Sequence, residues 1–221
     1  MPRQDTFTLI HKGLRTLIYK MGSSMQSTDF SDPVALPPLV AEVEHGLEVL
    51  AQHGGHEERF VFPRLADHAP ELVGIAGRHH QEIHNKIDSL HESLRVAAGE
   101  HDALRRVEEG EQLNRDLNDL LSFYLTHLCF EENNLQPVTY RVLTDEEIIG
   151  IRVAIQKSMP PEPYEDFFKV VLASTNNPEL ISILAGTKTG APPEAVRNIV
   201  RLVEQVLPPE WVQRIRERAG A

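Results

Sequence analysis

Long stretches of helical periodicity constrain the fold of this chain more than any other feature of its sequence. In the first stretch, apolar residues recur every three or four positions, as at Phe7, Ile10, Leu14 and Leu17, which places them on one face of an α-helix. Three further stretches repeat this pattern, separated by proline, glycine or polar loops. We predict helices over about residues 5–25, 37–63, 70–99 and 102–137.

These predicted helices favour an up-and-down bundle, because helices of roughly 20 to 35 residues with short connections lie antiparallel to their chain neighbours. No stretch of the sequence shows the alternation of a half-buried strand. We therefore expect an all-α fold, whose first domain, residues 1–138, is an up-and-down four-helix bundle. Gly54 and Gly55 interrupt the second helix at about 1 kcal/mol each relative to alanine. They mark either a local distortion or a close approach by a neighbouring helix.

The rest of the chain, residues 139–221, differs in character and is expected to form a smaller region of short helices. The tripeptide Pro-Pro-Glu occurs three times there, at residues 160–162, 192–194 and 208–210. Proline in the first helical position followed by glutamate is a helix-start signal. The expected helices cover about residues 144–158, 163–174, 178–186, 193–206 and 209–218.

Two helix caps are predicted in this second region. Thr144 and Glu147 have the spacing of a capping box, and Asn177 with Pro178 is interpreted as another cap and first turn. The sequence does not indicate a role for the region. If the chain has a protein partner, we expect the partner to bind through residues 139–221.

The chain is acidic, with 22 basic and 33 acidic residues and a formal net charge of −11. A nucleic-acid-binding surface is basic, and an anionic membrane surface would repel this chain. No apolar run approaches the roughly 18 residues of a membrane span, and the N-terminus lacks the apolar core of a signal peptide. One cysteine excludes an internal disulfide framework and a Cys-based zinc site. We therefore expect a cytoplasmic protein that binds neither nucleic acid nor membranes.

Histidine is distributed unevenly along the chain. There are 11 histidines, and none follows His127 although the chain continues to Ala221. A chemistry that uses histidine therefore belongs to the predicted bundle.

Two segments of the bundle resemble each other. One runs from His53 to Pro63 and the other from His127 to Pro137, and both have the pattern His-x-x-x-Glu-Glu-x-x-apolar-x-Pro. The histidine and the first glutamate, four residues apart, share one face of a helix with their Cβ atoms about 5–6 Å apart. Such a pair can bind one metal ion, or bind one ion and bridge to a second. The proline is expected to stop each helix.

The phase of the predicted helices turns a set of metal-binding side chains inward. Leu50, for example, shares a helical face with His53, and Ile83 lies between His80 and His84. A lone inward histidine is more often a hydrogen-bonded core residue, and a single His-x-x-x-Glu is more often a surface pair. Polar groups on core-facing stripes are costly unless they are paired or bound, so their repetition on four helices favours a shared metal site. The candidate ligands are His11, His53, Glu57, His80, His84, His127 and Glu131.

The number and type of these candidate ligands indicate which metal they would bind. One bond from each histidine and two from each bridging glutamate nearly fill two octahedral ions that share an oxygen bridge, and about one position stays open. A second position is open if His84 is not a ligand. Mixed imidazole and carboxylate ligation with an open position is typical of iron, less so of manganese, and of zinc if the site is tetrahedral. If two ions share an oxo or hydroxo bridge in this way, we predict that both are iron, with manganese or zinc as the alternatives.

Together these residues resemble a hemerythrin-like, HHE cation-binding domain. The resemblance covers about residues 5–140, and its motifs are His11-Lys-Gly-Leu-Arg15, His53-x-x-x-Glu57-Glu58 with Phe62-Pro63, His79-His80-x-x-x-His84, and His127-x-x-x-Glu131-Glu132 with Pro137. It implies a four-helix bundle around a non-haem di-iron centre, with the seven candidate residues as ligands. Members of that family bind oxygen, sense oxygen or iron, or handle peroxide and nitric oxide.

The sequence departs from the family's patterns at several positions. Oxygen-carrying members place an acid five residues after the last histidine, here Glu132, whereas the iron-sensing type uses the four-residue spacing, here Glu131. The inward phase favours Glu131. Some relatives have a single histidine on the third helix, which leaves His84 open, and the acidic residue that often precedes the first histidine is Ile10 here.

Three residues near the motifs allow more than one interpretation. Glu58 and Glu132 lie about 100° around the helix from the predicted ligands, so they are either solvated or placed just outside the ligands. Tyr124 is either a core tyrosine or a hydrogen-bond partner of the site.

The expected function is that of a non-haem di-iron protein. It would bind or sense a small ligand such as O₂, NO or peroxide, or iron itself. The alternatives are a metal-dependent oxidoreductase with peroxidase or NO-reducing activity, and an interaction module with a structural metal site.

Overall fold

The computed structural model describes residues 3–190 and 193–219. Every regular element within these residues is helical, which confirms the predicted all-α fold. In chain order the elements are α1 (Thr8–Ser27), α2 (Leu36–His56), η1 (Glu57–Val61), α3 (Phe62–Leu65), α4 (Pro70–Gly99), α5 (Ala103–Phe130), η2 (Glu131–Leu135), α6 (Gln136–Val142), α7 (Asp145–Ser158), α8 (Pro161–Ser174), α9 (Asn177–Gly190), α10 (Pro193–Val206) and α11 (Pro209–Ala219).

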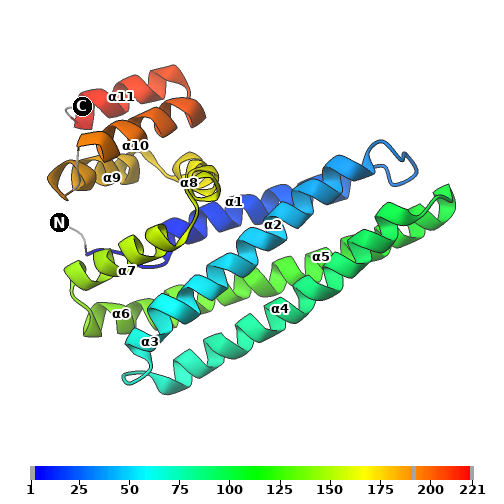
Figure 1. Cartoon of the computed structure of the whole chain (residues 1–221), viewed down its shortest axis with the longest axis horizontal. Helices are drawn as coiled ribbons and strands as arrows, with labels where there is room; N and C mark the ends of the chain where they lie inside the picture. Colours follow the sequence, from blue (N-terminus) through cyan, green and yellow to red (C-terminus); the bar gives the residue numbers. More distant parts are fainter. Residues whose placement is uncertain (1–2, 191–192, 220–221) are drawn as a thin grey trace. The chain divides into compact units, whose positions relative to one another are not determined.

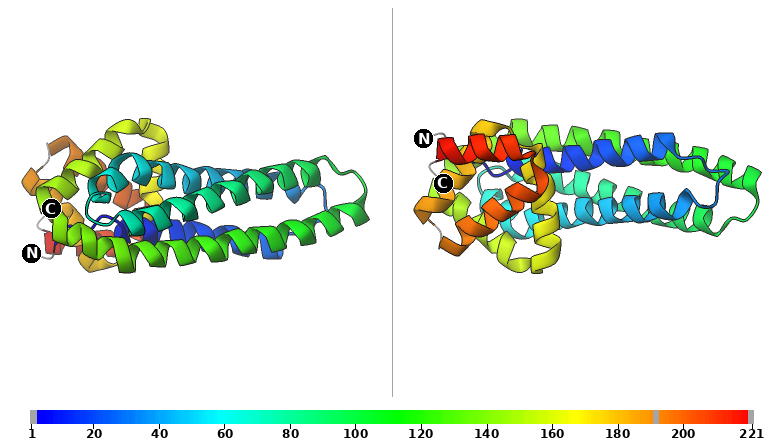
Figure 2. Two further views of the ribbon diagram at one scale, coloured as in Figure 1. Left: turned by 90° about the horizontal axis from the view of Figure 1, so that it is seen from below. Right: turned by 90° about the horizontal axis from the view of Figure 1, so that it is seen from above.

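The long helices form a bundle. Figure 1 shows α2, α4 and α5 running lengthwise beside one another together with the C-terminal part of α1, and both views in Figure 2 agree. Each long helix buries one stripe, and burying one large apolar side chain of such a stripe stabilises the fold by about 1.5–3 kcal/mol. On α4 the buried residues are Ala76, His80, Ile83, Ile87, Leu90, Leu94 and Ala97.

A glycine allows α1 and α2 to approach each other closely. A Cβ atom added to Gly46 on α2 would lie 2.1 Å from the sulfur of Met21 on α1, and Met21 is fully buried. Glycine in a helix costs about 1 kcal/mol relative to alanine. The packing of Met21 on the bare backbone offsets that cost.

Both motif segments leave regular α-helical geometry at the same place. The N–H of Phe62 donates to the carbonyl of Glu57, and the N–H of Gln136 donates to the carbonyl of Glu131, so each turn spans five residues and is π-helical. Proline is the second residue after each turn. Its ring collides with the carbonyl four residues earlier in a regular helix, and the wider turn ahead of it avoids this collision.

The prediction that these prolines stop their helices is therefore wrong. Pro63 and Pro137 lie in the first turns of α3 and α6, which continue the chain as helix. A missing N–H is tolerated in a first turn.

A buried arginine closes the opposite end of the bundle. Arg106 on α5 is 6% exposed. Its guanidinium donates to the carbonyls of Phe30 (3.2 Å), Ser31 (2.7 Å), Glu100 (3.3 Å) and His101 (2.8 Å). These carbonyls belong to the α1–α2 and α4–α5 connections, so one side chain joins both loops.

Proline marks the start of three helices in the second region, although α8 begins at Pro161 and not at the predicted residue 163. Helices α8, α10 and α11 each start at the second proline of a Pro-Pro-Glu tripeptide. The predicted capping box forms, because Glu147 accepts from the N–H of Thr144 at 2.9 Å and Thr144 accepts from the N–H of Glu147 at 3.2 Å. The cap of α9 is Asn176 rather than the predicted Asn177, since the Asn176 side chain accepts from the N–H of Glu179 at 3.0 Å.

Contacts divide the chain into two compact units. The first comprises the chain up to Ile155 apart from residues 8–16, and the second comprises residues 8–16 and the chain from Gln156 onward. The predicted domain division at residue 138 stays a prediction. Buried apolar residues form a core in the second unit: Leu172, Leu180, Leu184, Leu202, Val203 and Val212. Among the described residues, no helix combines the length and apolar character needed to cross a bilayer.

Candidate metal centre

The two π-helical turns place a carboxylate at the same point of each motif. Glu57 is the first residue of η1, and Glu131 is the first residue of η2. His80 comes from the middle of α4, and His127 from the last turn of α5. All four side chains are buried, with exposed fractions between 0 and 3%. Three separate parts of the bundle thus bring polar groups into its core.

The ligand atoms of these four residues converge. Nε2 of His80 lies 3.0 Å from Nε2 of His127, 3.4 Å from Oε2 of Glu57 and 3.8 Å from Oε1 of Glu131. Nε2 of His127 lies 3.4 Å from Oε2 of Glu131. One ligand atom from each residue can be chosen so that all four lie within 4.8 Å of one another.

These separations fit a metal ion. Ligand atoms held at about 2.1 Å from one ion are about 3.0 Å apart at a right angle and about 3.4 Å apart at the tetrahedral angle. The 3.0 and 3.4 Å separations of the His80, His127, Glu57 and Glu131 atoms correspond to both arrangements. Two imidazoles and two carboxylates are also a donor set that divalent transition metals bind.

A second group of ligand atoms shares both carboxylates. His11, His53, Glu57 and Glu131 also offer atoms within 4.8 Å of one another, and Nε2 of His53 lies 3.3 Å from Oε1 of Glu57. His11 is fully buried on α1, and His53 is nearly so near the end of α2. Six of the seven predicted ligands therefore take part in these two groups.

The electrostatics of the site favour a cation. Burial raises the pKa of Glu131 well above the ordinary glutamate value, and the neighbouring Glu57 carboxylate raises it further. Burial lowers the pKa of His80, but the hydrogen bonds and charges of Glu57 and Glu58 outweigh this effect and raise that pKa overall. Two adjacent buried carboxylates repel each other when both are ionised. An ion between them would relieve the repulsion.

The structure does not bring the predicted ligand His84 to the site. His84 is exposed on α4 and belongs to neither group of ligand atoms. The buried stripe passes through His80, Ile83 and Ile87, and position 84 lies about 100° beyond Ile83 on the helix. His84 is therefore not among the ligand atoms that the structure brings together.

Tyr124 is a buried residue with its hydroxyl bound to the backbone. The hydroxyl donates to the carbonyl of Leu50 on α2 at 3.0 Å, and the ring contacts the His127 ring edge-on at 5.8 Å. Burial raises the pKa of Tyr124 well above its ordinary value, and the charges of Glu57 and Glu131 add to this. Tyr124 thus joins α5 to α2 beside the site.

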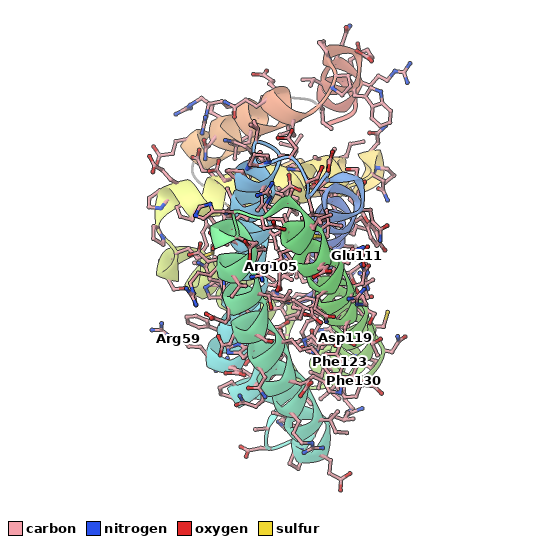
Figure 3. The ribbon with its side chains drawn as sticks, turned by 90° about the vertical axis from the view of Figure 1, so that its right-hand side faces the viewer. Arg59, Arg105, Glu111, Asp119, Phe123 and Phe130 are labelled. Carbon is pink, nitrogen blue, oxygen red and sulfur yellow. The ribbon has the colours of Figure 1, made fainter. Side chains whose placement is uncertain are left out.

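Sequence reasoning missed an aromatic group that covers His127. His79 contacts the rings of His127, Phe123 and Phe130 at centroid distances of 5.6, 5.5 and 5.1 Å. Figure 3 labels Phe123 and Phe130 in order along α5. Their seven-residue spacing, about two helical turns, is the signal that could have placed them on one face.

Comparison with known proteins agrees with this geometry. The family model of the hemerythrin HHE cation-binding domain matches residues 4–139, which include both motifs and every residue of the two ligand groups. No curated protein and no solved structure matches the chain. The matched segment is more than half of the 221 residues. The chain therefore belongs to the hemerythrin HHE cation-binding domain family.

Proposed function

We propose that this protein binds two iron ions at the buried centre and uses them to bind or sense a small ligand such as O₂, NO or peroxide. The observation that carries the proposal is that the two groups of ligand atoms share Glu57 and Glu131. A carboxylate has two oxygens and can bind one ion with each. Two ions bridged by both carboxylates are therefore compatible with the arrangement.

The choice of iron rests on the chemistry of the donors. Imidazole suits zinc, copper, iron and nickel, whereas carboxylate suits harder ions, so a mixed set with free coordination positions favours iron. Omitting His84 leaves more than one position free in the predicted coordination. Iron bound here would supply an open coordination site and the ability to change its oxidation state.

The protein's own residues would hold the ions and keep water away from them. The apolar side chain four residues after each carboxylate in the chain is fully buried: Val61 on η1 and Leu135 on η2. Tyr124 adds a buried ring next to His127. A small uncharged ligand enters such an apolar environment at less cost than a charged one.

Metal content and the absorption spectrum test the proposal. The full chain is purified under aerobic and anaerobic conditions, supplied with Fe²⁺, and freed from unbound metal. We expect about two iron ions per chain and a visible absorption that changes on addition of O₂, NO or hydrogen peroxide. A chain that retains no iron under either condition would refute the proposal.

A turnover assay separates binding from catalysis. The iron-loaded protein is given hydrogen peroxide or NO together with an electron donor. Stoichiometric spectral changes without continued consumption support binding or sensing. Sustained consumption that requires Glu57 and Glu131 would instead establish an oxidoreductase.

A further inference from the structure

Glu58 lies at an exposed position and forms a hydrogen bond with His80, a histidine of the centre. Its side chain is 49% exposed, and its Oε1 lies 3.0 Å from Nδ1 of His80, which is buried. A carboxylate only accepts hydrogen bonds, so Nδ1 of His80 carries the proton and donates. In that tautomer the other ring nitrogen, Nε2, keeps its lone pair.

The remaining contacts of His80 fix the direction of that lone pair. The Phe62 ring stacks on the imidazole at a centroid distance of 5.1 Å and an interplanar angle of 14°. Gly54 lies against the imidazole as well, since a Cβ there would be 3.5 Å from three ring atoms. The ring is therefore held both at Nδ1 and by its stacking contacts. Nε2 faces the ligand atoms of Glu57 and His127.

Glu132, which holds the position of Glu58 in the second motif, lies in different surroundings. Glu132 is partly buried, and its charge contributes to the raised pKa of Glu131. Glu58 instead lies at the surface and contacts a histidine from another helix, α4, 22 residues along the chain. The repeated Glu-Glu pair thus places its second carboxylate in two different environments.

From this geometry we propose that Glu58 is a positioning residue for the metal centre. It keeps His80 in the tautomer with Nδ1 protonated and Nε2 directed at the ion, without binding the ion itself. The inference rests on the proposed function, because it assigns Glu58 a role towards the same iron. Carboxylates bound to metal-ligating histidines orient the ring and raise its basicity, and their loss typically weakens metal binding by about 10–100-fold.

The first test determines the tautomer of His80 in the absence of metal. The metal-free full chain is labelled with ¹⁵N-histidine, and its imidazole nitrogens are observed by NMR as the pH is raised until the His80 signals stop changing, so that the ring is neutral. We expect His80 to show a protonated Nδ1 in the wild-type chain. In Glu58→Ala, the His80 signals should move towards a mixture of tautomers. The His80 signals are assigned as those missing from His80→Asn.

The second test measures affinity. Anaerobic titration with Fe²⁺ should show about 10–100-fold weaker binding in Glu58→Ala. Glu58→Gln keeps an acceptor oxygen and should recover part of the loss. The matched control is Glu48→Gln, which removes one charge from an exposed position on α2 and should leave the affinity unchanged.

The two tests separate the two proposals. Unchanged His80 nitrogen signals and unchanged Fe²⁺ affinity in Glu58→Ala overturn the role of Glu58 even if the protein binds iron. An equal loss of affinity in Glu48→Gln also overturns it, because the effect would then be one of net charge. A wild-type chain that binds no iron refutes the proposed function, while the metal-free NMR measurement still decides whether Glu58 sets the tautomer.

Discussion

The bundle buries charge in two places and balances it in different ways. The guanidinium of Arg106 donates to four backbone carbonyls of two nearby connections, so neutral acceptors of the chain itself satisfy this charge. At the other place, the carboxylates of Glu57 and Glu131 lie next to imidazoles, which carry a full positive charge only when protonated. The arginine site is complete once the chain has folded. The carboxylate site acquires a matching charge only by taking up protons or a metal ion.

The comparison indicates that the two places serve different purposes. Hydrogen bonds from a charged group contribute about 1.5–3 kcal/mol each to stability, so Arg106 supports the fold directly. Adjacent buried carboxylates cost stability in the absence of a cation. Buried carboxylates that lower stability in this way are typical of functional sites.

The largest expected effect comes from removing either shared carboxylate. Glu57→Ala and Glu131→Ala, made separately, should each lower iron affinity by more than about 100-fold, because each variant takes one donor from both groups of ligand atoms. Iron per chain after reconstitution is the measurement. Retention of wild-type iron content by both variants would contradict the bridging assignment. The Glu48→Gln chain serves as the charge control.

The next largest effect should come from Arg106. Arg106→Met keeps much of the side-chain volume but leaves buried carbonyls without a donor, and we expect the free energy of unfolding to fall by about 2–4 kcal/mol. Urea denaturation of the metal-free chain measures this. The neighbouring Arg105 is exposed, so Arg105→Met should change stability by less than about 0.5 kcal/mol. Equal losses in the two variants would show that the buried hydrogen bonds contribute little.

A rise in pH should lower the stability of the metal-free chain and raise the stability that a bound metal ion adds. In the metal-free fold the pKa values of His80 and Glu131 are both raised. The stability linked to these groups is fully present below their ordinary pKa values and is lost as the pH rises through the raised values. The metal-free chain should therefore become less stable as the pH rises from the ordinary glutamate value to above the ordinary histidine value.

Metal binding should reverse this dependence. A bound ion requires deprotonated ligands, so its affinity rises with pH. The difference in melting temperature between the Zn²⁺-loaded and metal-free chains should therefore widen as the pH increases, with Zn²⁺ used because it is not redox-active. The Glu131→Gln chain, which lacks one titrating group, should show a flatter metal-free profile. A difference that narrows with rising pH would contradict the electrostatic account of the site.

The smallest expected effect concerns the glycines before the first π-helical turn. A Cβ on Gly55 would meet no atom within 4 Å, so Gly55→Ala should raise stability by up to about 1 kcal/mol through helix propensity. Gly77 on α4 is equally unobstructed, and Gly77→Ala is the matched control. A gain in the control but not in Gly55→Ala, measured by thermal unfolding, would mean that forming the π-helical turn requires this glycine.

The helices of this protein were accessible from local sequence signals. The start and end of α4, at Pro70 and Gly99, agree with prediction because proline and glycine act through their own backbone. The π-helical turns were not predicted. Proline was expected to end the helix, and whether a chain stops or widens its turn at proline depends on how the adjoining segment packs, here the buried Phe62 and Leu65 of α3.

The sequence predicted the type of candidate site but not every residue that forms it. The repeated His-x-x-x-Glu motif and the inward phase of His80 identified five side chains whose ligand atoms the structure brings together: His53, Glu57, His80, His127 and Glu131. His84 lies outside both groups, because spacing by four defines a neighbour on the helix surface and does not say where the buried stripe ends. Glu58 was left between two interpretations until its contact with α4 was visible.

The sequence by itself determined which segments are helical and which residue types face inward, because helix formation and helical phase depend on groups within a few residues of one another. Only the tertiary structure decided that atoms from α2, η1, α4, α5 and η2 meet at one point, and that Glu58 rather than a more distant carboxylate touches His80. These contacts join residues far apart in the chain. Their distances depend on how whole helices pack, which no local pattern specifies.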